Sequence, residues 1–458
     1  MLDARDRCDA RPLGYNRPLD LPESDMVPRL KTALAGPLLD LERRILDRMP
    51  EIERWLRTKW QEHAVPFYAS VDLRNAGFKL APVDTNLFPG GFNNLNPESL
   101  PLAVQAIQAA VERVCADARG VLLIPENHTR NLHYLQNVAT LEGILQQAGM
   151  RVRIGTLLPD VTEPTRVELP SGDALTLEPI ARHGRRVGVG DFDPCMVLLN
   201  NDLSGGSPAI LENIDQPVAP SLTAGWYNRR KSKHFAAYAR VAREFGALLD
   251  IDPWLVDPYF GVCGEINFQE RGGEECLASN VGVLLERIKR KYDEYRIDEK
   301  PFVIVKADAG TYGMGIMTVR DANDVLGLNR KQRNKMAVVK EGLQVESVII
   351  QEGVPTFESI DDAIAEPVVY MVDRFVVGGF YRMHAARGKD ENLNAPGAQF
   401  QALAFESPCI PDLEGPAGCP PNRFYAYGVV ARLAQLAASI EIEALDDAPA
   451  AAATAPAL

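Results

Sequence analysis

The sequence lacks the features that mark membrane, secreted and nucleic-acid-binding proteins. No apolar run reaches about 18 residues, so no membrane span is predicted. The first residues, MLDARDRCDARPL, carry charges where a signal peptide needs an apolar stretch. Basic residues are in the minority, with 49 Lys and Arg against 62 Asp and Glu, and this disfavours nucleic acid as a partner. We therefore expect a cytoplasmic globular protein that acts on small molecules and has neither nucleic-acid nor membrane partners.

Cysteine is also scarce and has no metal-binding spacing. The seven cysteines are scattered, their number is odd, and no CxxC pair occurs. This pattern argues against a zinc site or a disulfide framework and fits a reducing compartment. Cys409 and Cys419 share a Pro/Gly-rich segment and could pair, although two free thiols are the simpler interpretation. Cys276 is expected to be structural.

The two common phosphate-binding signatures, GxxxxGK[ST] and GxGxxG, are missing as well. In their place, the apolar run 303–305 ends in Lys306, and Gly310, Gly313 and Gly315 follow. Glycines let backbone N–H groups approach phosphate oxygens, and the lysine supplies a compact positive charge. Taken alone, a glycine-rich hairpin with an incidental lysine accounts for this segment equally well.

Helical and strand-like patterns alternate along the chain and predict an α/β protein. Helices are expected over 28–63, with a break at Pro50, and apolar strands with intervening helices between 121 and 202 predict a parallel sheet. The part after Val281 is richer in antiparallel hairpins, with Gly378-Gly379 as one turn. We divide the chain into an N-terminal helical segment (1–63), an α/β domain (64–280), a second unit (281–440) and a low-complexity, disordered tail (441–458).

The segments after Lys306 place polar residues in an informative order. The apolar strand ending at Gln351 and Glu352 leads to Val354, a hairpin ends at Arg382, and Asn394 lies in a polar turn. This order resembles the ATP-grasp superfamily. The resemblance implies that Lys306 contacts the α- and β-phosphates of ATP, that residues 351–354 form the adenine hinge, that Arg382 lies near the γ-phosphate and that Asn394 belongs to the nucleotide site. The alternative for Arg382 is a surface charge.

ATP chemistry needs Mg²⁺ held by carboxylate and amide oxygens. The C-terminal region offers only Glu441 and Glu443, but Asp84 and Asn86 lie two residues apart, on one face of an expected strand. Their segment resembles the acidic-x-Asn motif of eukaryotic-type glutathione synthetases, whose ATP-grasp order is circularly permuted. This resemblance implies Asp84 and Asn86 as Mg²⁺ ligands, with Asp308 as a possible third. An Asx turn before Pro89, and a water-facing Asp308, are the alternatives.

Candidate substrate groups follow the expected strands of the first half. Guanidinium groups bind carboxylates in bidentate fashion, and loops at strand ends commonly hold ligands. Lys231 and Lys233 are candidates for a second nucleotide lysine, and Lys233 is included in the predicted site, although this basic run also fits a solvated helix start. The predicted substrate ligands are Arg74, Arg130, Asn131, Asn201 and Asp202.

Residues 15–435 are similar to the proteobacterial type of glutamate–cysteine ligase family. The similarity is carried by VDTNLFPGGFNNL, IPENHTRN, LNNDLSGG, GWYNRRKSKHF, INFQERGGEE, VKADAGTYGMGIMTV and RMHAARGKDENLNAPGAQF. It implies an ATP- and Mg²⁺-dependent ligase that joins L-glutamate to L-cysteine through an acyl phosphate, the first step of glutathione synthesis. The residue patterns by themselves indicate only a carboxylate–amine ligase. Glutathione synthetase, a kinase and a non-catalytic nucleotide-binding protein remain alternatives.

Overall fold

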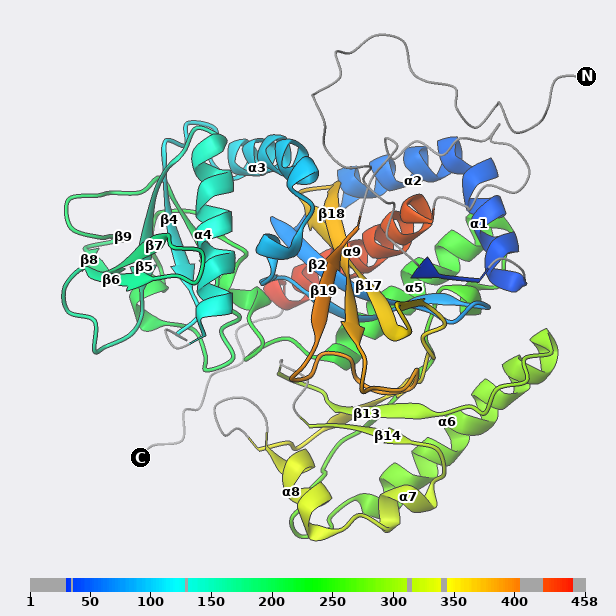
Figure 1. The fold of residues 1–458 in the computed structure, drawn as a ribbon. Coiled ribbons are helices and arrows are strands. Elements are labelled where there is room, and N and C mark those ends of the chain that lie inside the picture. Colours follow the sequence, from blue (N-terminus) through cyan, green and yellow to red (C-terminus); the bar gives the residue numbers. More distant parts are fainter. Residues whose placement is uncertain are drawn as a thin grey trace, which may run out of the picture.

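The three-dimensional structure is a computed structural model that describes residues 30–33, 36–127, 131–310, 315–338, 344–403 and 423–447. The three larger sheets of the described residues lie in three parts of the molecule (Figure 1). A largely parallel sheet forms one side of the molecule, and an antiparallel sheet forms its centre. A smaller antiparallel sheet lies below the central sheet in this view. The mixed α/β class expected from the alternation of helices and strands is confirmed.

The first part of the described chain is helical, as predicted. Helices α1 (Pro37–Asp47) and α2 (Met49–Glu62) are separated at Arg48, and Pro50 lies in the first turn of α2, where its missing N–H costs nothing. Both helices bury an apolar face at helical spacing, from Leu38 to Leu56. The short strand β1 (Leu30–Lys31) precedes them and pairs with β16 (Ser359–Ile360).

The parallel sheet has the order β11-β10-β4-β5-β7-β6, and within it β6 and β7 form the antiparallel pair. Its strand β4 is GVLLIP and is buried throughout, as expected for a strand covered on both faces. Helices α3 and α4 lie beside it (Figure 1). The elements are α3 (Leu100–Val114), β4 (Gly120–Pro125), α4 (Leu132–Gln147), β5 (Arg151–Thr156), β6 (Thr165–Glu168), β7 (Ala174–Pro179), β10 (Met196–Asn200) and β11 (Val218–Ala219), with the hairpin β8 (Ala181–His183) and β9 (Arg186–Gly188).

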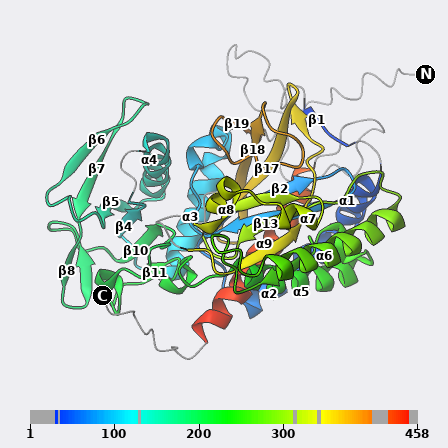
Figure 2. The same ribbon diagram turned by 90° about the horizontal axis from the view of Figure 1, so that it is seen from below.

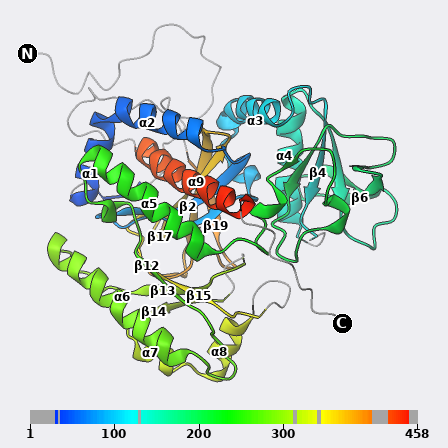
Figure 3. The same cartoon turned by 180° about the vertical axis from the view of Figure 1, so that it is seen from behind.

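The central sheet joins segments that are far apart in the sequence. Strands β2 (Tyr68–Asn75) and β3 (Leu80–Asn86) pair with each other, and β2 also pairs with β17 (Ala363–Val372), which continues to β18 (Phe375–His384) and β19 (Gln399–Ala402). Helices α5 (Lys231–Leu249) and α9 (Phe424–Asp446) lie side by side behind this sheet (Figure 3). The predicted boundary at residue 280 therefore does not separate two structural units.

The hairpin between β17 and β18 corrects one prediction. Its turn is formed by Asp373 and Arg374, and Gly378 and Gly379 lie inside β18. Asp373 takes the left-handed conformation that the turn needs, with φ of 51°. A Cβ atom on Gly379 would lie 2.5 Å from the Val368 carbonyl oxygen. This glycine is thus required by close strand packing and not by a turn.

The smaller sheet has the order β12-β15-β13-β14 and is antiparallel. Its strands are β12 (Phe260–Cys263), β13 (Val303–Ala307), β14 (Ile316–Val319) and β15 (Val348–Glu352). Helix α6 (Glu274–Tyr295) packs on this sheet, and the short helix α7 (Asn323–Leu326) packs against α6. Helix α8 (Arg330–Ala337) follows α7 in the chain, and Figure 2 shows all three helices from below.

The C-terminal boundary also differs from the prediction. Helix α9 continues to Asp446, and Glu441 within it is buried, so residues 441–446 belong to the fold and not to a disordered tail. The apolar face of α9, with buried residues such as Leu433 and Leu436, accounts for this extension. Among the described helices, none has the length and apolar character that a membrane crossing requires.

Candidate active site

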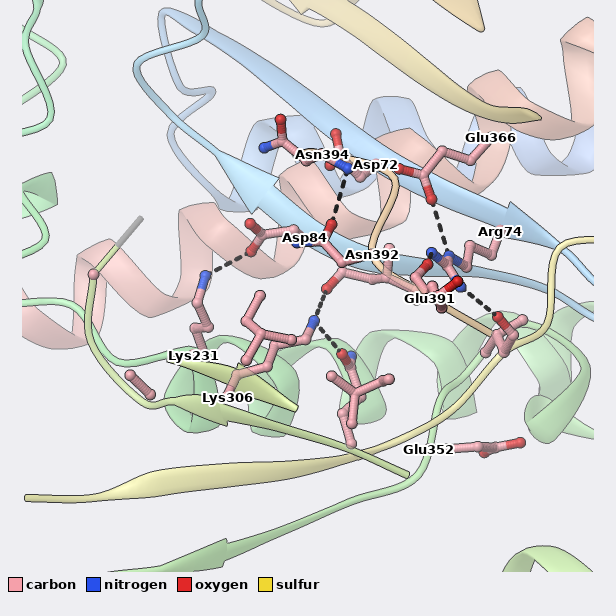
Figure 4. A pocket seen from close by; sticks show the side chains of 17 residues that line it. Asp72, Arg74, Asp84, Lys231, Lys306, Glu352, Glu366, Glu391, Asn392 and Asn394 are labelled. Atoms are coloured by element: carbon pink, nitrogen blue, oxygen red, sulfur yellow. Dashed lines mark hydrogen bonds and ion pairs between the residues drawn. The ribbon is translucent and has the colours of Figure 1, made fainter. Parts of the chain in front are cut away.

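Lys306 lies near the end of β13 with its side chain directed toward the central sheet. Its Nζ donates to the Val83 carbonyl (2.8 Å) and to Gln351 Oε1 (2.7 Å), and both contacts are visible in Figure 4. Gln351 shares a face of the sheet with Lys306 because β13 and β15 pair in register. Burial lowers the pKa of Lys306 to about 8, although Asp84 acts to raise it. The lysine therefore links the two antiparallel sheets.

A cavity surrounds this lysine (Figure 4). Its wall contains predicted nucleotide residues from three separate segments: Gly310, Gln351, Glu352, Val354 and Asn394. The structure thus brings together residues that the sequence placed in one site. Gly315 does not line the cavity, and its carbonyl accepts from the Ala307 N–H (3.1 Å). Gly313 lies outside the described residues.

The expected hinge is supported from behind by a buried ion pair. The Glu352 carboxylate accepts from Lys79 Nζ (2.8 Å), from Trp254 Nε1 (3.0 Å) and from the Tyr259 N–H (2.9 Å). Lys79 is fully buried, and burial lowers its pKa, although Glu352 acts to raise it. The charge of Glu352 is therefore matched inside the protein, and its side chain anchors the end of β15.

Asp84 lies on β3 between two lysines. Its Oδ1 accepts from Lys231 Nζ at 2.8 Å, and Lys306 is close enough to affect its ionisation. Desolvation by the surrounding walls acts to raise the pKa of Asp84, but Lys231 and Lys306 outweigh it and lower the pKa to about 2. The carboxylate is therefore ionised at neutral pH, as a cation ligand must be.

Asn86 lies two residues along the same strand and has two roles. Its Oδ1 accepts from the Phe88 N–H (2.9 Å), which is the Asx turn considered as the alternative, and its side chain also lines a cavity that Asp84 shares. Among the residues that the structure describes, no group of three or more His, Cys, Asp or Glu is arranged to hold a metal. Mg²⁺ commonly takes one or two carboxylates together with substrate phosphates and water, so this pair fits such a cation.

Asp308 does not belong with this pair. Its carboxylate accepts from the backbone N–H of Ser232 and from the Ser232 hydroxyl, both at 2.7 Å. Its side chain therefore caps the beginning of α5, and it lines none of the cavities found here. Asp308 therefore holds the start of α5, and its role as a third metal ligand stays a prediction.

A second, larger cavity of about 710 Å³ lies between the central sheet and the parallel sheet. This volume is in the usual range for small-molecule sites. Two of the predicted substrate residues, Asn131 and Asp202, follow β4 and β10 and line this cavity, and so does Arg382 from β18. Asp72, Asp84 and Asn394 line both cavities, so the two spaces meet at these residues.

Two other predicted substrate residues are placed differently. Asn201 is buried, donates to the Pro125 carbonyl (3.1 Å) and accepts from the Leu203 N–H (3.0 Å), so it shapes the strand end without facing the cavity. Arg74 lines the Lys306 cavity and not the larger one. Its orientation is set by Glu366 and by the Val354 carbonyl. Arg130 lies outside the described residues.

Arg382 is held in a chain of buried charges. Its guanidinium donates to Asp72 (2.7 Å) and to Glu366 (2.8 Å), and Glu366 also accepts from Arg74 Nε (2.9 Å). Arg382 Nε has no partner among the described residues. Arg382 is therefore not a plain surface charge. The row of buried charges from Arg382 through Glu366 to Arg74 connects the larger cavity to the expected hinge, because Arg74 donates to the Val354 carbonyl.

The two lysines at the start of α5 point in different directions. Lys231 is buried, contacts Asp84 and lies over the Trp226 ring at 4.3 Å, whereas Lys233 is exposed and lines none of the cavities found here. Two residues along a helix rotate the side chain by about 200°, so one lysine faces the site and the other faces solvent. The structure thus places Lys231, and not Lys233, at the Lys306 cavity, and the inclusion of Lys233 in the nucleotide site gains no support from it.

Five polar residues that line the Lys306 cavity were absent from the predicted site: Asp72, Lys231, Glu366, Glu391 and Asn392. Asp72 could have been found from the β2–β3 hairpin, because its register places Asp72 opposite Asp84. Glu366 lies opposite Arg382 in the β17–β18 hairpin, but its second partner, Arg74, is on the distant strand β2 and leaves no local signal.

Comparisons with known proteins identify the family of the chain. The profile of the family described as GshA, glutamate–cysteine ligase, matches residues 42–442. The chain belongs to the glutamate–cysteine ligase family. As a member of it the chain is a ligase, and the family resemblance stated from the sequence is confirmed. A solved structure from Methylobacillus flagellatus KT, assigned as a γ-glutamylcysteine synthetase, is 64% identical, with a TM-score of 0.85 over 92% of this chain and 99% of that chain.

Two further solved structures are much more distant. One is D-alanyl-alanine synthetase A from Vibrio cholerae O1 biovar eltor str. N16961, with 10% identity and a TM-score of 0.31 over 62% of this chain and 74% of that chain. The other is a glutathione synthetase-like effector, GSS30, from Globodera pallida, with 10% identity and a TM-score of 0.35 over 80% of each chain. Among curated proteins, no sequence matches the chain.

Proposed function

We propose that this ligase forms γ-glutamylcysteine from L-glutamate and L-cysteine, with ATP and Mg²⁺, on a circularly permuted ATP-grasp scaffold. The observation that carries the proposal is the position of Asp84. It lies at the junction of the Lys306 cavity and the larger cavity, beside two lysines. A phosphoryl group must pass between a nucleotide and a carboxylate in such a reaction, and this junction is where both could meet.

The nucleotide is assigned to the Lys306 cavity. Residues 351–354 would bind the base along the end of β15, and Lys306 would contact the phosphates. Lys306 precedes its glycine segment and follows Asp84 in the chain, which is the order expected of a permuted ATP-grasp protein. Strand β13, which carries Lys306, pairs with β15, which carries the expected hinge, and this pairing supports the scaffold.

Glutamate and cysteine are assigned to the larger cavity. The γ-carboxylate attacks the γ-phosphorus of ATP, and ADP leaves, so that an acyl phosphate forms. The cysteine amine then attacks the acyl carbon, and phosphate leaves. Lys306, Lys231 and Arg382 are positioned to neutralise the charge that develops in these steps. Asp84 and Asn86 would hold Mg²⁺, which neutralises phosphate charge when bound.

An ADP-release assay with glutamate, with and without cysteine, tests the proposed reaction. We expect ADP release that requires both amino acids and a product with the mass of γ-glutamylcysteine. ADP release that instead requires γ-glutamylcysteine and glycine would assign the chain to glutathione synthesis and overturn the proposal. ATP binding without turnover under any substrate would do the same.

The assignment of Asp84 is tested separately by titrating Mg²⁺ against the ligase rate. Asp84→Asn keeps the shape of the side chain and removes its charge, and we expect a much higher Mg²⁺ requirement than in the unchanged enzyme. Asp321→Asn is the matched control, because Asp321 is exposed and lines neither cavity. Identical Mg²⁺ titrations for the two variants would reject Asp84 as a ligand.

A further inference from the structure

Two cysteines face each other at the edge of the smaller sheet. Cys263 ends β12, and Cys276 lies in the first turn of α6, which packs beside this strand (Figure 3). Their Sγ atoms are 3.4 Å apart. Cys263 is buried, whereas Cys276 is exposed. The pair thus combines a thiol that a small oxidant can reach with a second thiol directly behind it.

The surroundings allow the two sulfurs to come together. A disulfide has an S–S distance of about 2.05 Å, so the sulfurs must approach by about 1.4 Å from their present separation. Asn280, one helical turn after Cys276, donates to Cys276 Sγ (3.6 Å) and helps to orient it. Gly264 has no heavy atom within 4 Å of the position a Cβ would take, so the backbone after Cys263 has room to move.

We propose that Cys263 and Cys276 form a reversible disulfide when the protein meets hydrogen peroxide. The Cys276 thiolate attacks one oxygen of the peroxide, the O–O bond breaks, and hydroxide leaves with Cys276 as a sulfenic acid. Cys263 sulfur then attacks Cys276 sulfur, the S–O bond breaks, and the hydroxide and the Cys263 proton leave as water. Two thiols are oxidised, and one peroxide is reduced to two waters.

The burial of Cys263 agrees with this order of steps. Burial raises the pKa of the Cys263 thiol to about 11, and its hydrogen bond with Cys276 raises the pKa further. A protonated, shielded thiol is a poor first reactant toward peroxide, because the thiolate is the nucleophile. Cys276 is therefore the residue that meets the oxidant, and Cys263 is the residue that completes the bond.

The bond would tie an edge strand of the nucleotide-side sheet to its covering helix. Strand β12 pairs with β15, and Phe260 lies opposite Gln351, whose side chain contacts Lys306. The two cysteines are 13 positions apart, so the disulfide closes a short loop and restricts the unfolded chain. We therefore expect the oxidised protein to unfold at a higher temperature than the reduced protein.

The test uses the folded, full-length chain, treated with hydrogen peroxide and then with an alkylating reagent. Trypsin separates the two cysteines, since cleavage after Arg243, Arg271 and Arg287 yields peptides 244–271 and 272–287. We expect these peptides to be cross-linked, the cross-link to disappear with dithiothreitol, and the unfolding temperature to rise on oxidation by several degrees. Alkylated Cys263 together with irreversibly oxidised Cys276, and no cross-link, would overturn the proposal.

Two variants show whether the effect belongs to this pair. Cys276→Ser changes an exposed side chain, so it should fold, and peroxide should no longer shift its unfolding temperature. Cys115→Ser is the matched control, since Cys115 is half-buried at the end of α3, and it should retain both the cross-link and the shift. An equal peroxide effect on the unfolding temperatures of Cys276→Ser and the unchanged protein would exclude the pair as the cause.

Discussion

At the scale of single residues, the two lysines of α5 provide the sharpest comparison. Lys231 contacts Asp84 and is buried, whereas Lys233 points to solvent from the next-but-one position. We expect Lys231→Ala to lower kcat/KM by roughly 100-fold or more, as is typical when a group that neutralises transition-state charge is removed, and Lys233→Ala to leave it within about twofold. Steady-state ligase assays on both variants decide this. Similar losses in the two would reject the inward role of Lys231.

The low pKa of Lys306 predicts a pH dependence of ATP binding. Phosphate oxygens favour the charged lysine, so its pKa of about 8 in the free protein should rise when ATP binds. Between the two pKa values, binding takes up a proton. ATP affinity should therefore fall as pH rises above about 8, by at most about tenfold per pH unit.

Titration calorimetry from pH 7 to 9.5 measures this dependence. Lys306→Arg is the control, because arginine keeps its charge over the whole range and its ATP affinity should stay constant. A constant ATP affinity of the unchanged protein between pH 7 and 9.5 would contradict the assignment of Lys306 to the phosphates.

The site residues that could be predicted from the sequence are those with a local signal. Lys306, Asp84 and Gln351 lie at strand ends next to turn-forming segments, so strand periodicity places them. Asp308 and Lys231 could not be assigned in this way. Whether the Asp308 carboxylate faces a cation or caps α5 depends on where α5 begins, and α5 is distant from Asp308 in the sequence. The start of α5 also decides whether Lys231 or Lys233 faces inward.

At the scale of elements, the helices and the parallel strands were predictable, and the sheet partners were not. Strand β4 reads as a continuous apolar run, and α4 has a regular apolar spacing, so each is recognisable from its own segment. The pairing of β2 with β17 joins residues about 300 positions apart and leaves no local signal. That pairing places Arg74 of β2 within hydrogen-bonding distance of Glu366 of β17.

The glycines of β18 and α4 allow a matched test of element packing. A Cβ on Gly379 would overlap the Val368 carbonyl oxygen at 2.5 Å and also approach Leu403, whereas Gly143 in α4 has nothing within 4 Å. We expect Gly379→Ala to destabilise the protein by roughly 1–3 kcal/mol, as overpacking does. Gly143→Ala should instead stabilise it by up to about 1 kcal/mol. Urea unfolding curves measure both changes, and a stable Gly379→Ala variant would contradict the close strand packing.

At the scale of the whole molecule, α9 ties the C-terminal end of the described chain to the active-site helix α5. Glu441 accepts from Arg229 at 3.1 and 2.8 Å, and His234 Nδ1 lies 3.3 Å from the same carboxylate. The Arg229 and Glu441 side chains are almost completely buried. Arg229 lies two residues before Lys231. The ion pair therefore fixes the part of the chain from which Lys231 reaches Asp84.

This ion pair predicts a loss of stability that depends on pH. Burial acts to raise the pKa of Glu441, but Arg229 and His234 outweigh it and lower the pKa to about 2. Because the folded state binds this proton less readily than the unfolded chain, the contribution of Glu441 is present above its ordinary pKa of 4.5 and is lost as pH falls toward 2.

Glu441→Ala should destabilise the protein by roughly 3–5 kcal/mol at pH 7, because it leaves Arg229 charged and buried without its partner. Glu443→Ala on the same helix is the control: Glu443 is half-buried and pairs with His63, so its removal should cost about 1 kcal/mol or less. Urea unfolding at pH 7 and pH 4 distinguishes the two variants. The difference in unfolding free energy between the unchanged protein and Glu441→Ala should be smaller at pH 4. Equal losses in both variants, or a difference that does not change with pH, would contradict the role of the buried pair as the link between α9 and α5.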